Sequence, residues 1–328
     1  MKILVIGLGS MGRRRIRLLQ KIDPKMEIIG IDSNSQRRED AEKAFAISTA
    51  DSIDTALAKS AADAAVISTS PLQHAHLIKD CLTACLHVFT ELNLVSDLYS
   101  ENLALARSKG KVLFLSSTFL YRDETRYIRE RVNSCAKPLN YTYHIGQYLP
   151  DWHPWESYKN YFVADSRSNA CREIFAIEMP WLRKTFGEIA SFSVEAGKSS
   201  TLDINYPDTY HVILRHDSGT VGSLNVDVVT RKAVRNLEIY GEELYLSWNG
   251  SPLGLSEYDF EKKCDRRIEL YQDIDTLDGY SSFVVENAYQ NELRCFLDEI
   301  AGKSKAEYTF EDDIVTLDLI DKFEKAGK

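Results

Sequence analysis

A short apolar run that leads into a glycine-rich turn constrains the fold of this chain more than any other feature. The run KILVI stops at Gly7, and Gly7, Gly9 and Gly12 form the pattern G-x-G-x-x-G. Residues 10–22, SMGRRRIRLLQKI, then have the apolar spacing of a helix. In a strand–turn–helix unit the glycines permit a tight turn, and the helix N-terminus attracts a pyrophosphate. We therefore predict a dinucleotide-binding turn formed by Gly7, Gly9, Ser10, Met11 and Gly12.

An acidic residue follows at the spacing that such a turn requires. Asp32 ends the next predicted strand, MEIIGID, 20 residues after Gly12. A carboxylate at that position can bind the adenosine ribose hydroxyls and would repel the 2′-phosphate of NADP. Five arginines weaken the distinction, because a guanidinium can pair with a phosphate: Arg13, Arg14, Arg15, Arg37 and Arg38. We predict NAD as the cofactor without excluding NADP.

The first 118 residues alternate between strand-like and helix-like segments. Apolar runs such as AAVI and KVLFL are separated by segments with helical spacing. Pro71 opens one of these segments, where its missing N–H costs little. Strands that are apolar on both faces are typical of a parallel sheet covered by helices on both sides. Residues 1–118 therefore predict a doubly wound Rossmann domain that binds NAD(P).

The pattern changes after Thr118. Residues 122–134 have the spacing of one polar helix, and strand candidates then dominate, two of them joined by the hairpin signal DSG at 217–219. Three later segments have helical spacing: 171–187, 284–302 and 310–327. We predict that residues 119–328 form a second α/β domain for substrate binding and oligomerisation, built on an open, mainly antiparallel sheet.

Composition limits the classes of partner. The 328-residue chain carries a formal net charge of −9, which disfavours nucleic acid and anionic membranes. It contains no run of about 18 apolar residues, the length expected of a membrane-spanning helix. Its six cysteines form no C-x-x-C pair, which fits a reducing compartment and disfavours disulfides or a zinc framework. We expect a cytoplasmic protein with a small-molecule substrate, no metal, and neither nucleic acid nor membrane as partner.

Several segments resemble the Gfo/Idh/MocA oxidoreductase family, named for glucose–fructose oxidoreductase and inositol dehydrogenase. ILVIGLGSMGRR resembles the opening of that family, and DAAVISTSPLQHAHLI resembles its segment beside the nicotinamide. RNLEIYGEELYLSW and YTFEDDIVTLDLIDK resemble parts of its second domain, so the resemblance covers nearly the whole chain. It implies NAD(P)-dependent hydride transfer and an open sheet used in a homodimer or homotetramer. It also implies further cofactor-side residues: Thr69, Ser70, Pro71, His74 and Glu91.

Two departures from the family leave the catalytic group open. The family usually has E-K-P after the strand HVFT, whereas this chain has Glu91-Leu92-Asn93, so the usual catalytic lysine is absent. Counting back from Gly187, the position of the family's acid/base histidine falls on Ile177.

Three residues are candidates to replace the missing groups. His153 has an unperturbed pKa near neutrality, and a buried carboxylate at Glu173 or Glu178 could act as a base with a raised pKa. Each has an alternative: the two glutamates could be ion-paired with Arg172 or Arg183, and His153 could be a packed loop residue. The candidates for substrate contacts by stacking or hydroxyl groups are Trp155, Tyr158 and Tyr161.

We predict an NAD(P)-dependent oxidoreductase that transfers a hydride between nicotinamide and a sugar or nucleotide-linked sugar. The segment YLPDWHPWESYKNYF resembles a branch of the family linked to bacterial surface-polysaccharide synthesis. The missing lysine and histidine keep two alternatives open. One is a dinucleotide-binding protein without redox turnover, such as a sensor or inactive partner subunit, and the other is an NAD-dependent lyase or epimerase with no net redox change.

Overall fold

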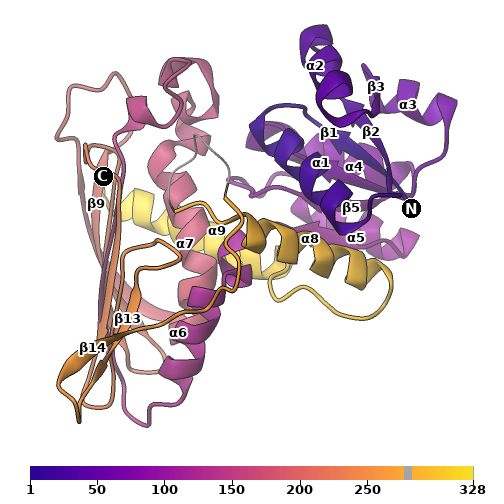
Figure 1. Ribbon diagram of the computed structural model, residues 1–328. Helices are drawn as coiled ribbons and strands as arrows, with labels where there is room; N and C mark the ends of the chain where they lie inside the picture. The colour runs from indigo at the N-terminus through magenta and orange to yellow at the C-terminus, as the bar shows by residue number, and fades with distance from the viewer. Residues whose placement is uncertain (277–282, 328) are drawn as a thin grey trace. The chain divides into compact units, whose positions relative to one another are not determined.

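The protein is described from a computed structural model that covers residues 1–276 and 283–327 (Figure 1). The chain divides into two compact units. The first consists of residues 1–118 and 289–314, and the second of residues 119–288 and 315–328. The sequence prediction assigned all of 119–328 to one domain, whereas this division places 289–314 with the nucleotide-binding segment.

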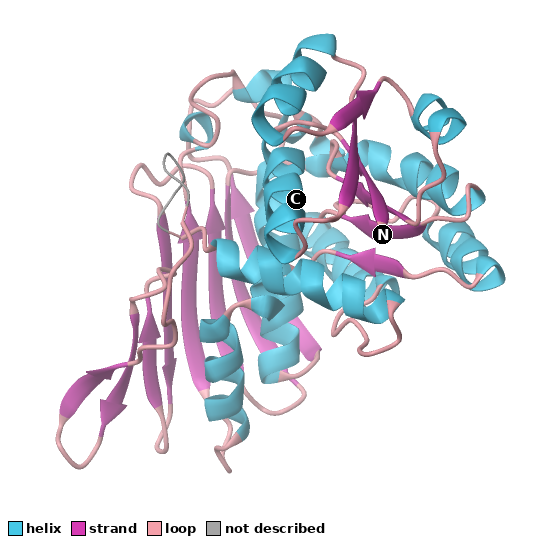
Figure 2. Cartoon of the chain, turned by 45° about the vertical axis from the view of Figure 1, so that its right-hand side comes forward, coloured by secondary structure: helices cyan, strands magenta, loops and turns pink. Residues whose placement is uncertain are grey.

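The first unit is built on a six-stranded parallel sheet in the order β3-β2-β1-β4-β5-β6, with helices on both sides of its strands (Figure 2). The strands are β1 (Lys2–Ile6), β2 (Glu27–Ile31), β3 (Ser48–Ala50), β4 (Ala64–Ile67), β5 (His87–Thr90) and β6 (Leu113–Leu115). The helices are α1 (Ser10–Ile22), α2 (Ser35–Phe45), α3 (Ile53–Lys59), α4 (His74–Thr83) and α5 (Tyr99–Lys109), with the short 3-10 turn η1 (Pro71–Gln73) before α4. This confirms the predicted doubly wound sheet.

Burial on both faces explains why these strands are almost entirely apolar. All four residues of β4 are buried, and Phe89 of β5 stacks on Phe114 of β6 with ring centroids 5.3 Å apart. Phe296, distant in the sequence, packs edge-on against both rings at 5.6 and 5.7 Å. These aromatic contacts explain why residues 289–314 belong to the first unit, because they bury rings of that sheet.

The second unit is built on an eight-stranded sheet in the order β14-β13-β12-β11-β7-β10-β9-β8. Among the described strands of this second sheet, only β7 and β10 pair in parallel, and the other neighbours are antiparallel. The strands are β7 (Asn140–Gly146), β8 (Ile189–Gly197), β9 (Thr209–His216), β10 (Val221–Asp227), β11 (Val234–Tyr240), β12 (Tyr245–Trp248), β13 (Leu255–Asp259) and β14 (Cys264–Arg267). The mainly antiparallel second sheet is therefore confirmed.

Helices cover one face of this second sheet. Strand β9 shows the resulting alternation, since Tyr210, Val212 and Leu214 are buried while His211 and Ile213 are exposed. The helices of this unit include α6 (Asp123–Asn133) and α7 (Ala170–Phe186), which lie along the strands in Figure 1. Short 3-10 turns follow η1: η2 (Thr118–Tyr121), η3 (Leu149–Asp151), η4 (Tyr158–Asn160), η5 (Phe162–Ala164) and η6 (Ser166–Ser168). The last two helices, α8 (Glu286–Ile300) and α9 (Phe310–Ala326), each have residues in both units.

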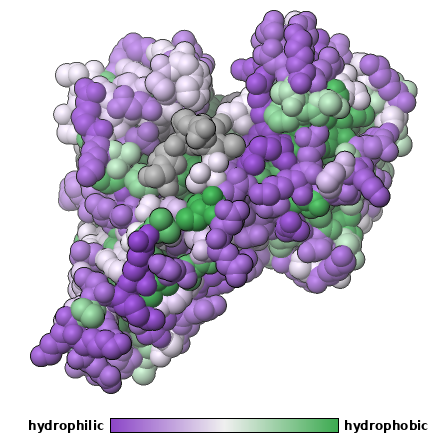
Figure 3. Space-filling view, in the orientation of Figure 1, coloured by the Kyte–Doolittle hydropathy of each residue, from purple (hydrophilic) through white to green (hydrophobic). Residues whose placement is uncertain are grey.

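The surface agrees with the high content of charged residues. On the face drawn in Figure 3, hydrophilic side chains predominate and hydrophobic ones form small patches. Across residues 1–276 and 283–327, no helix is both long enough and apolar enough to cross a membrane.

Candidate functional site

The glycine-rich turn joins β1 to α1 and has the geometry that its sequence requires. Gly7 has φ +91°, a conformation that favours glycine, and a Cβ there would lie 2.5 Å from the carbonyl oxygen of Ser68. A Cβ on Gly12 would lie 1.8 Å from the carbonyl oxygen of Gly7. A Cβ on Gly9, the N-cap of α1, would have no described atom within 4 Å. The turn is therefore packed tightly at Gly7 and Gly12 and open at Gly9, where a phosphate could approach the helix N-terminus.

Asp32 is held against this turn. Its Oδ2 accepts a hydrogen bond of 2.9 Å from the backbone N–H of Leu8, and its Oδ1 accepts one of 2.9 Å from Asn34 N–H. The guanidinium of Arg37 lies 3.6 Å from Oδ2, and the Asp32 side chain is only 8% exposed. The carboxylate thus fixes the end of β2 to the glycine turn.

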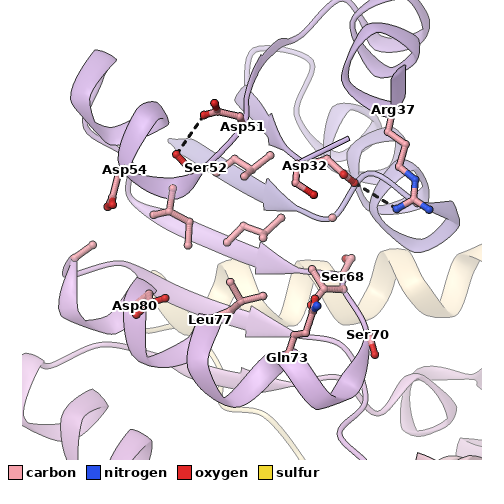
Figure 4. A pocket seen from close by; sticks show the side chains of 18 of the residues that line it. Asp32, Arg37, Asp51, Ser52, Asp54, Ser68, Ser70, Gln73, Leu77 and Asp80 are labelled. Atoms are coloured by element: carbon pink, nitrogen blue, oxygen red, sulfur yellow. Dashed lines mark hydrogen bonds and ion pairs between the residues drawn. The ribbon is translucent and has the colours of Figure 1, made fainter. Parts of the chain in front are cut away.

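A pocket of about 910 Å³ opens at the carboxyl ends of β1, β2, β3 and β4 (Figure 4). Ligands in doubly wound sheets bind at this edge. Of the residues predicted to bind the cofactor, Gly7, Gly9, Asp32, Thr69 and Ser70 line the pocket. The others, which do not line it, are Ser10, Met11, Gly12, Pro71, His74 and Glu91.

The charges around the pocket favour NAD over NADP. Four carboxylates line it, and one cation, Arg37, lies among its lining residues; the carboxylates are Asp32, Asp51, Asp54 and Asp80. Figure 4 shows them on the strand ends and helices around the cavity. An added 2′-phosphate would meet more negative than positive charge.

An unpartnered hydroxyl indicates that the pocket suits a polar ligand. Thr69 Oγ1 is buried and has no hydrogen-bond partner in the part of the chain that the structure describes. Such atoms normally bond to protein, water or a ligand. The glycine turn, Asp32 and Thr69 together fit a dinucleotide.

His74 holds in place the Thr69 loop, which lines the pocket. It is fully buried, with Nδ1 2.7 Å from Asn93 Oδ1 and Nε2 3.0 Å from the carbonyl oxygen of Thr69. Burial lowers the pKa of the imidazole. His74 therefore orients the Thr69 loop, and Asn93 is its partner, which the sequence analysis missed.

Glu91 has a structural partner. Arg15 Nε lies 2.6 Å from Glu91 Oε1 and Nη2 lies 2.8 Å from Oε2, while Nη2 also lies 2.9 Å from Glu292 Oε2. The Arg15 guanidinium is completely buried, 4.5 Å above the ring of Phe89. Both oxygens of Glu91 are thus engaged within the first unit, and its predicted cofactor contact stays a prediction. Sequence reasoning missed Arg15, because nothing in RRRIR distinguishes a buried arginine from a solvated one.

In the second unit, Glu178 is a buried structural carboxylate. It accepts hydrogen bonds from Tyr143 Oη at 2.8 Å and Trp181 Nε1 at 2.7 Å, and Arg235 Nη2 lies 2.6 Å from its other oxygen. The ion pairs suggested with Arg172 or Arg183 are not formed among the described residues. Arg172 pairs with Asp321 and Glu324, and Arg183 pairs with Glu188.

Glu173 lies five residues earlier on α7 in a different environment. Its Oε2 is buried, and no described residue offers it a hydrogen bond. Desolvation by burial raises the pKa of this carboxyl to about 7. The Tyr161 hydroxyl is likewise buried without a described hydrogen-bond partner. Burial, and then the negative charge of Glu173, raise the pKa of the Tyr161 phenol. Glu173 and Tyr161 are therefore two buried polar groups without described hydrogen-bond partners, and the charge of Glu173 acts on the Tyr161 hydroxyl.

The loop before α7 connects Tyr161 to two other predicted residues. The His153 ring lies 4.4 Å from that of Tyr161 and stacks on Trp155 at 5.1 Å with an interplanar angle of 15°. His153 Nδ1 also lies 3.0 Å from Glu156 Oε1. Tyr158 bonds elsewhere, its hydroxyl accepting from Asp203 N–H at 3.1 Å. The structure thus brings His153, Trp155 and Tyr161 together. No group of three or more possible metal ligands occurs in the described ranges.

Comparison with solved structures shows the same fold over the whole chain. GenD2 from gentamicin A biosynthesis, in complex with NAD, is 16% identical with a TM-score of 0.78, covering 100% of this chain and 94% of that chain. Myo-inositol 2-dehydrogenase from Lactobacillus plantarum is 17% identical with a TM-score of 0.79, covering 100% and 97%. UDP-N-acetylglucosamine 3-dehydrogenase GnnA from Acidithiobacillus ferrooxidans is 17% identical with a TM-score of 0.75, covering 99% and 97%. At these identities the likeness shows the fold.

Comparison of the sequence with known families and curated proteins adds information beyond the fold. No curated protein matches the chain. Residues 1–117 match the family model described as "Oxidoreductase family, NAD-binding Rossmann fold". This range ends one residue before the first continuous segment of the first unit does, and it contains the glycine turn, Asp32 and the pocket. Residues 1–117 are therefore similar to the NAD-binding Rossmann domain of the Gfo/Idh/MocA oxidoreductases, the family that the sequence resembles.

Proposed function

We propose that this oxidoreductase transfers a hydride between NAD(H) and a carbinol carbon of a sugar or nucleotide-linked sugar. The observation that carries the proposal is the pocket at the strand ends of the first unit, with its open turn at Gly9, its acidic lining and the unpartnered Thr69 hydroxyl. When bound, NAD supplies a nicotinamide ring that accepts or donates the hydride. Solved structures of this fold include a myo-inositol dehydrogenase and a UDP-N-acetylglucosamine dehydrogenase, which supports polyhydroxylated substrates.

Oxidising a carbinol also requires a base for the hydroxyl proton. Glu173 is our first candidate, because its Oε2 has no hydrogen-bond partner among the described residues and is free to accept one from a substrate. Its pKa of about 7 makes the ionised and protonated forms comparably populated near neutral pH. The same group can therefore take the proton during oxidation and return it during reduction.

The other two candidates rank below it. His153 can exchange protons near neutral pH, but its Nδ1 already has a partner in Glu156. One oxygen of Glu178 accepts from Tyr143 and Trp181, and the Arg235 guanidinium lies 2.6 Å from the other, so three neighbours hold this carboxylate in place. We rank His153 second and assign Glu178 a structural role.

Trp155 and Tyr161 are the proposed substrate contacts. Aromatic rings bind sugars by covering the apolar C–H face of the ring, and the unpartnered Tyr161 hydroxyl can bond to a sugar hydroxyl. Tyr158 is a weaker candidate because its hydroxyl already accepts from Asp203 N–H.

Three wider proposals concern the biological role, the location and the assembly of the protein. The segment 148–162 supports a role in surface-polysaccharide synthesis, and the cysteine usage supports a cytoplasmic location. The exposed face of the eight-stranded sheet supports a homodimer or homotetramer. Light scattering of the purified chain would test the assembly, and a monomer at micromolar concentration would contradict it.

The test of the function is a turnover screen. The protein is incubated with NAD and a panel of sugars, sugar acids and nucleotide sugars, and NADH is followed by absorbance. We expect NADH to form with at least one member. Glu173→Gln should abolish most of that rate, His153→Asn should lower it less, and full activity in both variants would remove our candidates for the acid/base.

A second function is favoured by one observation. Leu92 and Ile177 stand where the family usually has its lysine and histidine, which supports a protein that binds dinucleotide without turnover. NAD binding in calorimetry with no NADH from any substrate would favour it. A lyase or epimerase with tightly held NAD would instead convert a sugar without added cofactor, and product analysis would detect that.

A further inference from the structure

Two loops of the second unit are joined at the ends of β7 and β10. Leu149 N–H donates to the carbonyl oxygen of Val228 at 2.9 Å, and Gln147 N–H donates to that of Asp227 at 3.4 Å. One loop, residues 147–169, carries the aromatic stack described above. The other, residues 228–233, connects β10 to β11. Because the strands β7 and β10 are themselves paired, the two loops have a fixed relation to each other.

Asp227 holds the second loop in shape. Its Oδ1 accepts from the backbone N–H groups of Val229 at 2.9 Å and Thr230 at 2.8 Å. Its Oδ2 accepts from the Thr230 hydroxyl at 2.9 Å and lies 2.7 Å from Nε2 of His144. Through these bonds the carboxylate positions the loop that carries the cations that follow.

Those cations are Arg231 and Lys232. The Arg231 guanidinium lies 3.6 Å from the ring centroid of Tyr148, on the neighbouring loop. Both side chains are exposed, and in residues 1–276 and 283–327 neither has a carboxylate within ion-pair distance. By contrast, Arg172, Arg183 and Arg235 in the same unit each pair with a glutamate. Stacking on an aromatic ring orients a guanidinium before any anion arrives.

An exposed aromatic surface lies close by on the chain. Trp152 Nε1 donates to the carbonyl oxygen of Gln147 at 3.1 Å, which fixes the start of the loop beside Tyr148. Trp155 follows three residues later, at most about 11 Å along the chain. Its side chain is 69% exposed, although one face of its ring is supported by His153. A large exposed tryptophan backed by another ring is typical of a stacking surface for a ligand.

We propose that these two loops bind a nucleoside diphosphate group, with Arg231 and Lys232 on the phosphates and Trp155 stacked on the base. The inference rests on the proposed function and deepens it, because it selects a nucleotide-linked sugar over a free sugar. Two adjacent cations match two phosphates, and a free sugar would use neither of them. The bound nucleotide would be separate from NAD, whose pocket belongs to the first unit.

The test is calorimetric titration of the full chain with UDP, CDP, GDP and dTDP, each in the presence of saturating NAD. At least one should bind, and Arg231→Ala should raise its dissociation constant about tenfold. Arg231→Lys should recover part of the affinity, and Trp155→Ala should weaken binding of the nucleoside diphosphate more than that of inorganic phosphate. Arg215→Ala, an exposed arginine on β9 of the same unit, is the matched control and should bind as the unchanged protein does.

Other outcomes would overturn the inference. They are no binding of any of the four nucleotides, equal affinity in Arg231→Ala, and binding of glucose 1-phosphate as tight as that of the nucleotides. None of these would disturb the proposed function, which fails only if NAD binding or NADH formation is absent. Titration of Arg231→Ala with NAD separates the nucleotide-binding inference from the proposed function, because the NAD affinity of this variant should be unchanged.

Discussion

The cofactor pocket and helix α7 differ in what determines the residue at a position, which is backbone geometry in the pocket and the surrounding side chains on α7. In the pocket, backbone geometry decides: a Cβ on Gly12 would collide with the Gly7 carbonyl, and Asp32 is tied to the turn through Leu8 N–H. On α7, the surroundings decide: Glu173 and Glu178 are the same residue on one helix, yet one is unpartnered and the other has three partners. A backbone requirement restricts the residue type strongly, whereas a side-chain role can move to another position. This explains how a chain that resembles the family can have its glycine turn and yet have Leu92 and Ile177 where the resemblance would place a lysine and a histidine.

The largest expected effect is on stability, at Glu178. Glu178→Ala leaves the Arg235 guanidinium, the Trp181 N–H and the Tyr143 hydroxyl without their acceptor. We expect the free energy of unfolding to fall by about 3–5 kcal/mol, measured by urea denaturation. Glu188→Ala removes a half-exposed ion pair with Arg183 and should cost less than about 1 kcal/mol. Equal losses in the two variants would contradict the distinction between buried and exposed carboxylates.

The next effect is on cofactor affinity, at the glycine turn. Gly12→Ala should weaken NAD binding at least about 100-fold in calorimetry, because its Cβ would lie 1.8 Å from the Gly7 oxygen and must displace the turn. Gly9→Ala is the matched control. Its Cβ meets no described atom within 4 Å, so the unliganded fold should be unchanged while NAD binding weakens. Normal NAD affinity in Gly12→Ala would show that the turn does not bind the pyrophosphate.

Glu173 should affect catalysis and its pH dependence. Glu173→Gln should lower kcat by about 100-fold while leaving the fold intact, as expected for loss of a general base. In the unchanged protein, oxidation requires the ionised carboxylate, so the rate should rise with pH through about 7 and then level off. Reduction should show the opposite trend. A pH profile of Glu173→Gln that keeps the inflection would assign the titration to another group.

A smaller effect is expected at Asp32. Asp32→Ala removes a carboxylate from the pocket while Arg37 remains, so the preference for NAD over NADP should fall about tenfold. Asp40→Ala, an exposed carboxylate of the same unit paired with Arg13, should leave the ratio unchanged. An unchanged ratio in Asp32→Ala would mean that Asp51, Asp54 and Asp80 dominate the selectivity.

The smallest effect is the pH dependence of stability from Glu173. The folded-state pKa of about 7 lies above the ordinary value of 4.5, so the folded protein binds more protons than the unfolded chain between these values. This contribution to the free energy of unfolding therefore decreases as pH rises from about 4.5 to about 7. Urea denaturation should show a steeper decrease for the unchanged protein than for Glu173→Gln. Parallel curves would place the Glu173 carboxyl in contact with water.

Parts of the fold that depend on local sequence were predictable, whereas short or exposed elements were not. Helix α1 matches the predicted segment 10–22, because its apolar spacing and the glycine turn before it are local properties of the sequence. Strand β3 and helix α3 were not predicted because they are short, with 3 and 7 residues. Strand β14 was missed because its residues, CDRR, are all exposed and carry no alternating apolar pattern.

The missed features of the candidate site depend on distant residues. Arg15 is buried because Glu91 and Glu292 neutralise it, and Glu292 lies 277 positions later in the chain. Nothing local marks Glu173 as unpartnered or Glu178 as paired, since that difference comes from Tyr143 and Arg235 on two strands of the second sheet. Residues 289–314 join the first unit for the same reason, through contacts such as those of Phe296.

The most direct test of the central proposal is isotope transfer from substrate to cofactor. The protein would be incubated with NAD and, one at a time, the sugars and nucleotide sugars of the screen, each deuterated at its carbinol carbons in turn. We predict that deuterium from one of these carbons appears on the nicotinamide ring of NADH. If NAD binds in the pocket and no deuterium is transferred from any position, the protein binds its dinucleotide without redox turnover, and the proposed function is wrong.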